Sequence, residues 1–216
     1  LKNSRVPRWE LLASLCLLLG GAWLIFQQLA PAMDGWFLRE DSRFFSSGFF
    51  SLHDLLKAFA TPMNSMGQYR PVTRLLWGIP AWLGYFNIGA FRLLSVALLL
   101  ATALLLARLL FLYTGGLFAS LWGGVLFFLL RPHEKALYWI SAWHNSAVVL
   151  FSVMACVGRV EMWRRPDTFL RWRALSLVGL YLALASRESA FALFILLPCV
   201  DWLETGSVRR SWDVVL

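Results

Sequence analysis

Long apolar runs separated by short polar breaks dominate the chain and predict membrane-spanning helices. A helix needs about 20 mostly apolar residues to cross roughly 30 Å of hydrocarbon. Residues 11–30 meet this requirement without a charge, and residues 93–113 contain only Arg108, near the end, where a long side chain can reach the interface. We therefore expect an all-α polytopic membrane protein with about six spans. The expected spans cover residues 11–30, 93–113, 115–130, 136–157, 172–186 and 189–203.

The first run and the last two runs each allow a second interpretation. The basic residues before residue 11 would suit a signal peptide, but the run is longer than an h-region of about 7 to 15 residues, so a retained helix is favoured. Residues 172–186 and 189–203 would form either one long helix or a hairpin. The hairpin is favoured because it keeps Arg187 and Glu188 at a turn and out of hydrocarbon.

Composition and charge narrow the class of protein. Of 216 residues, 59% are hydrophobic and 15% charged, whereas a soluble domain has about 45 to 50% apolar and about 25% charged residues. An ordinary soluble enzyme is therefore excluded. A net charge of +8 would suit a nucleic-acid partner, but the apolar fraction leaves no soluble fold with a basic face. Cys16, Cys156 and Cys199 lie in apolar runs without CxxC spacing and predict neither a disulfide framework nor a zinc site.

The positions of the cations predict the orientation. With the N-terminus in the cytoplasm, the inner segments hold eleven Lys and Arg residues, the short outer turns hold three, and six lie in the first loop or at its exit. Basic residues favour the cytoplasmic side, so residues 31–90 form an outer loop. Connections in helix bundles usually have about 2 to 8 residues, so a loop of this length is a place to look for function.

Two amphipathic helices are predicted in this loop. Residues 51–59 place apolar side chains at positions i, i+3, i+4 and i+7, and Ser51 with Asp54 resembles a capping box. Residues 72–83 carry Trp77 and Trp82 and follow the break at Pro71, as expected for a helix lying in the membrane interface.

An acid stands at the start of the loop. Asp34 follows the first span by four residues, so its carboxylate would lie at the outer mouth of the membrane core, as a general base, a ligand for a divalent cation, or simply a solvated side chain. Glu40 and Asp41 are interpreted as loop acids paired with Arg39 or Arg43.

Several stretches together resemble a known superfamily. They are the loop that opens with Asp34 and Asp41, Tyr69-Arg70-Pro71-Val72, the turn Arg131-Pro132-His133-Glu134-Lys135-Ala136 followed by Tyr138-Trp139-Ile140-Ser141, and Ser186-Arg187-Glu188-Ser189-Ala190. In this order and on one membrane face, they are similar to motifs of the glycosyltransferase C superfamily. Within it, the chain looks like the protein O-mannosyltransferase and TPR-associated mannosyltransferase group, of which it would be the N-terminal part.

The resemblance implies an enzyme that transfers a sugar from a polyprenyl-phosphate carrier to a protein, glycan or lipid acceptor on the outer face. Asp34 would be its general base. The family often has two adjacent acids, whereas Gly35 follows Asp34 here, so a metal site with two carboxylates is in question and Asp41 is the candidate second acid. No cofactor is firmly implied, although a divalent metal would be compatible.

A lipid-linked sugar phosphate needs cations at the outer face, and arginine binds phosphate oxygens in a bidentate manner. Arg70 and Arg187 are the candidates for binding the donor phosphate. Either could instead pair with an acid, and Arg131 could simply end a helix. His133, Glu134 and Glu188 are candidates for orienting acceptor or donor.

Two other classes remain open: a transporter or flippase subunit for an anionic polyprenyl-linked lipid, and a non-catalytic scaffold with the same fold. No clear internal repeat, which transporters often show, is seen. A bacterial inner membrane is the favoured location, and the endoplasmic reticulum would suit the same topology.

Overall fold

Seven α-helices and two short 3-10 helices make up the described part of the chain. The computed structural model describes residues 7–33, 53, 57, 60–61, 69–84, 88–129 and 143–206. The all-α prediction is confirmed for these residues. The elements are α1 (Arg8–Met33), α4 (Pro71–Gly84), α5 (Ile88–Thr114), α6 (Leu117–Leu129), α8 (Trp143–Arg164), η2 (Pro166–Thr168), α9 (Phe169–Leu184), η3 (Glu188–Ala192) and α10 (Leu193–Thr205).

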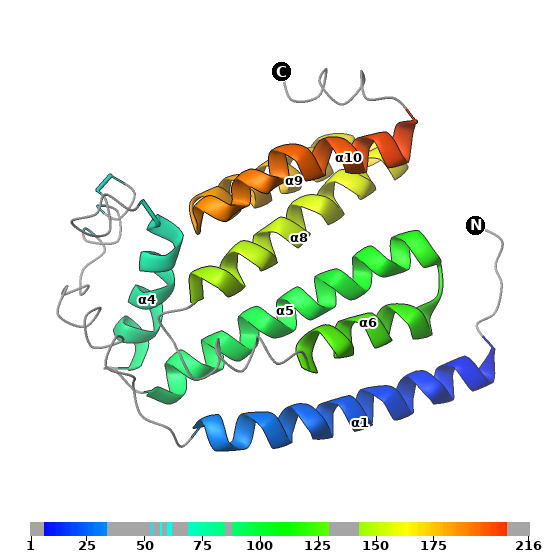
Figure 1. Ribbon diagram of the computed structural model, residues 1–216, viewed down its shortest axis with the longest axis horizontal. Helices are drawn as coiled ribbons and strands as arrows, with labels where there is room; N and C mark the ends of the chain where they lie inside the picture. Colours follow the sequence, from blue (N-terminus) through cyan, green and yellow to red (C-terminus); the bar gives the residue numbers. More distant parts are fainter. Residues whose placement is uncertain are drawn as a thin grey trace.

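The long helices run side by side in alternating directions, and α4 lies across one end of the bundle (Figure 1). We call this the α4 end. It also holds the start of α5 and α8 and the turn from α9 to α10. The opposite end holds the break between α5 and α6, where Gly115 takes the left-handed backbone conformation (φ 68°), and the end of α8.

Two of the described helices, α5 and α8, are long and apolar enough to cross a membrane. The apolar parts of α1 (Leu12–Leu24) and α6 are shorter. Helix α8 continues to Arg164, beyond the expected end at residue 157, because its last turns are buried and their charges are paired. The structure has a break between α9 and α10, as the hairpin interpretation requires, and both helices pack against α8. Of the segment 51–59, only His53 and Lys57 are described; both are helical and exposed.

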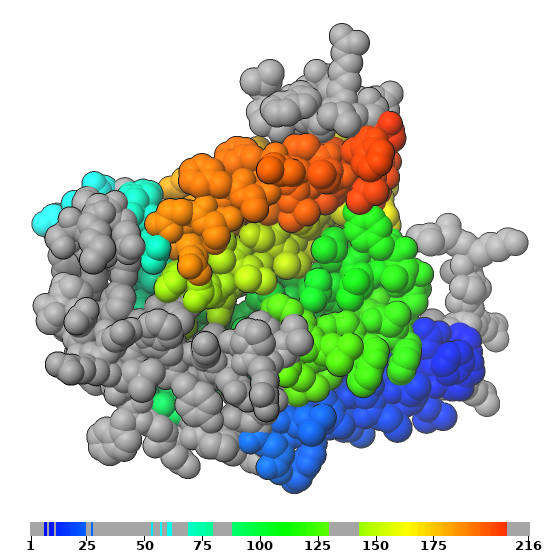
Figure 2. All heavy atoms as spheres, in the orientation of Figure 1, coloured from blue at the N-terminus to red at the C-terminus, as the bar shows by residue number. Residues whose placement is uncertain are grey.

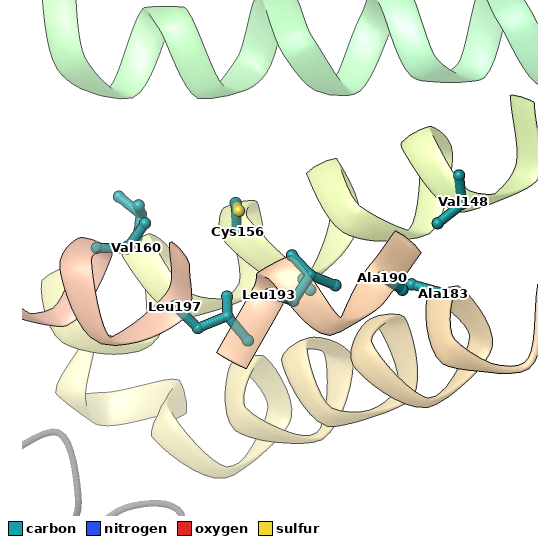
Figure 3. Close-up of a cluster of buried hydrophobic side chains, with 9 residues drawn as sticks. Val148, Cys156, Val160, Ala183, Ala190, Leu193 and Leu197 are labelled. Atoms are coloured by element: carbon teal, nitrogen blue, oxygen red, sulfur yellow. The ribbon is translucent and has the colours of Figure 1, made fainter. Parts of the chain in front are cut away.

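A cluster of small and branched apolar side chains joins α8, α9 and α10 (Figure 3). Cys156 carries a free thiol and is buried within this cluster. The cluster consists of Val148, Ala155, Cys156, Val160, Ala183, Ala190, Leu193, Leu197 and Val200. Because most of these side chains are short, the three helices approach closely and α8 becomes the centre of the bundle.

Apolar side chains cover much of the outside of this bundle, while several charged side chains are buried inside it. Arg92, Arg159, Glu161 and Asp201 are each no more than 2% exposed. Large apolar side chains on α1, α5, α9, η3 and α10 are at the surface, and Figure 2 shows α10 covering one side of the molecule and α1 the other. They include Leu12, Leu15, Leu19, Trp23, Leu93, Leu104, Leu177, Phe191, Ile195 and Leu203. Such a surface is stable against lipid, whereas in water it would favour association.

At the opposite end, α10 is fixed to α8 by a buried ion pair. Arg159 Nε and Nη2 donate to the two oxygens of Asp201 at 2.7 and 2.8 Å, and Trp163 Nε1 donates to Asp201 Oδ1 at 2.6 Å. Nearby, Glu161 pairs with Arg108 of α5 and with Arg165. These contacts connect three helices through their charged groups.

Asp201→Asn should strongly destabilise the protein, because it leaves the Arg159 charge buried without its counter-ion, a change that costs about 3 to 5 kcal/mol in other proteins. Thermal unfolding in detergent would measure it. Glu204→Gln is the control, since its partner Arg164 is 35% exposed and the expected loss is smaller. Equal losses in the two variants would contradict this prediction.

Helices α8 and α9 approach closely at two glycines. A Cβ atom at Gly179 would lie 2.8 Å from Ala155 N and 2.9 Å from Phe151 O, and one at Gly158 would lie 2.7 Å from Ser176 N. Since these neighbours are backbone atoms, they cannot move without shifting a helix.

Gly179→Ala should therefore lower the unfolding temperature, with an overpacking cost of about 1 to 3 kcal/mol. The matched control is Gly20→Ala in α1, where nothing lies within 4 Å of the added Cβ. There, the substitution should be neutral or stabilising, because alanine favours helix over glycine. A stabilised Gly179→Ala variant would contradict the close approach.

Candidate functional site at the α4 end

An ion pair joins two of the motif segments that are far apart in the sequence. Arg70 Nε donates to Glu188 Oε1 at 3.2 Å, and Arg70 Nη2 donates to Oε2 at 2.8 Å. The side chain of Arg70 is only 15% exposed, whereas that of Glu188 is 53% exposed. The pair therefore has one anchored partner and one partner at the surface.

The backbone around this pair is held by further contacts. Val72 N donates to Ala185 O at 3.3 Å, and the buried Thr73 Oγ1 donates to Ser186 O at 3.4 Å. Proline at the first position of α4 suits a helix start, because its missing N–H is not needed there. The first turn of α4 is thus fixed to the turn between α9 and η3.

An aromatic cluster packs α4 against the start of α5 and α8. The rings of Trp77, Phe91 and Trp143 have centroids 5.3 to 5.6 Å apart, and Trp143 Nε1 donates to Ser95 Oγ. Trp77 was expected at the membrane interface, but it is 4% exposed and belongs to the core. The apolar side of α4 is turned toward the bundle, which explains this difference.

The second candidate phosphate ligand lies beside the pair. Arg187 Nη1 donates to Asn145 Oδ1 at the start of α8. The hydrogen bonds from Arg70 hold the pKa of Glu188 below its ordinary value; partial burial opposes them, and the charges of Arg70 and Arg187 act in the same direction as the hydrogen bonds. Arg70, Arg187 and Glu188 together carry one net positive charge, so this arrangement can attract a further anion.

The other predicted site residues, Asp34, Asp41, His133 and Glu134, lie outside the described residues, as does Arg131. Helix α1 ends at Met33 and α8 begins at Trp143, both at the α4 end, whereas the shorter α6 ends at Leu129 part-way along α5 (Figure 1). Of the candidate site residues, the structure brings together Arg70, Arg187 and Glu188.

Sequence reasoning missed three features of this end. It assigned no role to Thr73 or to Asn145, which bind Ser186 and Arg187 in the structure. It also counted Arg92 among the loop cations, although this side chain is 2% exposed within α5. The position of Arg92 next to the expected span 93–113 could have indicated its burial. Ionisable residues buried in spans are often functional.

Within the described residues there is no group of three His, Cys, Asp or Glu side chains that could hold a metal ion. A scan against protein-family models and searches of curated proteins and of solved structures return no match. The resemblance to glycosyltransferases therefore stays an expectation from the sequence motifs.

The stabilising effect of Glu188 should depend on pH. Its pKa is lower in the folded than in the unfolded state, so its contribution is fully present above the ordinary value of 4.5 and is lost as the pH falls through the lowered value. The thermal stability of the natural protein should exceed that of Glu188→Gln at pH 7, by up to about 1 kcal/mol, and this difference should disappear in strong acid. A pH-independent difference would contradict the prediction.

Proposed function

We propose that the chain is part of a membrane glycosyltransferase that moves a sugar from a polyprenyl-phosphate donor to an acceptor. The observation that carries this proposal is the Arg70–Glu188 pair, which links residues 118 positions apart in two separate motifs of the resemblance. Arg187 of the second motif lies beside the pair. Two arginines at one end of an apolar bundle suit a ligand with a phosphate head and a lipid tail.

The proposed topology has about six spans, with the α4 end at the outer face, periplasmic or lumenal. It is supported by α5 and α8, by the apolar exterior of the bundle and by the arginines that gather at the opposite end. A bacterial inner membrane is the favoured location, and the endoplasmic reticulum is the alternative. The bilayer and the lipid-linked donor are the proposed partners, with a protein, glycan or lipid as acceptor.

In the proposed reaction, Asp34 takes the proton of an acceptor hydroxyl as its oxygen attacks the anomeric carbon. The bond from that carbon to the phosphate oxygen breaks, and the electron pair stays with the phosphate. Arg187, together with Arg70, stabilises the charge that develops there. Glu188, His133 and Glu134 are assigned to orientation of the substrates. Asp41 is the candidate second acid. A divalent cation is compatible with this reaction.

A non-catalytic scaffold is the second candidate function. The observation that favours it is the same ion pair, because Arg70 already has a carboxylate partner and fixes α4 to the bundle without any ligand. A transporter or flippase subunit would use the same arginines to bind a lipid head group.

Asp34→Asn should abolish sugar transfer, because the amide cannot accept the acceptor proton, while membrane insertion stays intact. The measurement is transfer of a labelled sugar from a synthetic polyprenyl-phosphate sugar by the full-length protein in liposomes, with membrane fractionation to check insertion. Asp54→Asn is the control, since Asp54 belongs to the same loop but is assigned no chemistry. Transfer by Asp34→Asn at the natural rate would remove Asp34 from the mechanism, and no transfer by any form of the protein would favour the scaffold or the flippase.

A further inference from the structure

Glu188 occupies the edge of the Arg70 guanidinium that a phosphate would use. The Nε and Nη2 groups donate in parallel to its two oxygens, at 3.2 and 2.8 Å. A phosphodiester presents two oxygens and a single negative charge, so it fits the same edge and replaces a carboxylate without a change in net charge. We propose that Glu188 is a tethered competitor for the phosphate of a lipid-linked ligand at Arg70, an inference that rests on the proposed function.

The exposure of the two partners favours this exchange. Arg70 is 15% exposed and Glu188 is 53% exposed, so the carboxylate can turn into water while the guanidinium stays in place. A half-exposed ion pair contributes little net free energy, because water solvates the separated carboxylate almost as well. The Arg164–Glu204 pair at the opposite end is also bidentate, but there the acid is the more buried partner, at 10% exposure against 35%.

Breaking the ion pair does not release the backbone that carries Arg70. The contacts from Val72 N to Ala185 O and from Thr73 Oγ1 to Ser186 O lie on the inner side of the pair and involve no charged group. Trp77 also remains packed against Phe91 and Trp143. The Arg70 guanidinium therefore keeps its position when Glu188 leaves, and an incoming anion finds it already oriented.

Arg187 makes the exchange favourable for a phosphate in particular. It precedes Glu188 in the chain, is held by Asn145, and its charge acts on the Glu188 carboxylate. A phosphate that replaces Glu188 at Arg70 therefore comes within the field of a second guanidinium. This second interaction compensates for the loss of the tethered partner.

The exchange also has a consequence for turnover. Sugar transfer converts a phosphodiester with one negative charge into a phosphomonoester, whose second ionisation has a pKa of about 6. The product would therefore bind the arginines more tightly than the donor. A carboxylate tethered next to Arg70 has a high effective concentration, so its return displaces the product and favours release.

The test is the affinity of the full-length protein, in phosphatidylcholine nanodiscs, for geranylgeranyl phosphate, with geranylgeraniol as the uncharged comparison. Glu188→Gln removes the competing charge and should bind the phosphate about 2- to 5-fold more tightly, the factor that corresponds to one half-exposed ion pair. Arg70→Gln should bind it more weakly. Glu204→Gln, which breaks the bidentate pair at the opposite end, should leave the affinity unchanged, and no variant should alter binding of the alcohol.

Equal or weaker binding by Glu188→Gln would overturn the inference, as would a gain that persists in the Arg70→Gln/Glu188→Gln double variant. Thermal unfolding of each variant checks the fold. If Glu188→Gln does not fold, Glu188→Asp replaces it, because its shorter carboxylate reaches Arg70 less well. That variant should then show a smaller gain in affinity, and an unchanged affinity would overturn the proposal.

Sugar transfer, measured on the same samples, separates this inference from the proposed function. Transfer with unchanged affinity in Glu188→Gln would refute the competitor and leave the transferase standing. A gain in affinity without transfer by any form of the protein would support the competitor and refute the transferase. Where transfer occurs, Glu188→Gln should slow multiple turnovers more strongly than the first turnover, because product release depends on the returning carboxylate.

Discussion

Arg159 and Asp201 bury an ion pair between α8 and α10, and this pair sets the register of the two helices. In apolar surroundings neither charge can be left without its partner, so α10 cannot slide along α8. Glu188 lies 13 residues before Asp201, through η3 and most of a short helix. At about 1.5 Å per residue, these 13 residues span roughly 20 Å. The Arg159–Asp201 pair therefore also positions the carboxylate of Glu188, which Arg70 binds at the α4 end.

The distribution of polar groups explains why the bundle needs such pairs. Its exterior is largely apolar, so the charged side chains that enter it must be satisfied by other helices and not by water. Helix α8 makes most of these connections, through Glu161 to α5, through Arg159 to α10 and through Asn145 to the α9–η3 turn. The close approach of α9 at Gly158 and Gly179 then needs no polar contact at all.

Hydropathy predicted the all-α fold and the approximate positions of the described helices, since apolar runs of this length have few other solutions in a membrane. It did not predict the pairing of charges. Glu188 follows Arg187 directly and a local pair was one alternative, but Arg187 donates its hydrogen bond to Asn145. The partner of Glu188 is Arg70 instead, 118 positions away. A distant contact of this kind depends on how α4 packs, and no local pattern contains that information.

Each end of the molecule contains a bidentate ion pair between an arginine and a carboxylate, but the two pairs differ in their exposure to solvent. Arg159 and Asp201 are both at most 2% exposed, and separating them would leave two charges without water, so this pair is permanent under native conditions. Arg70 and Glu188 form the same bidentate geometry with one partner half in solvent. Exposure, and not the geometry of the ion pair, therefore decides which pair holds the bundle together and which one can exchange its anion. In a membrane protein, the exchangeable pair has to lie at an interface, where water can receive the displaced carboxylate and a lipid can supply its replacement.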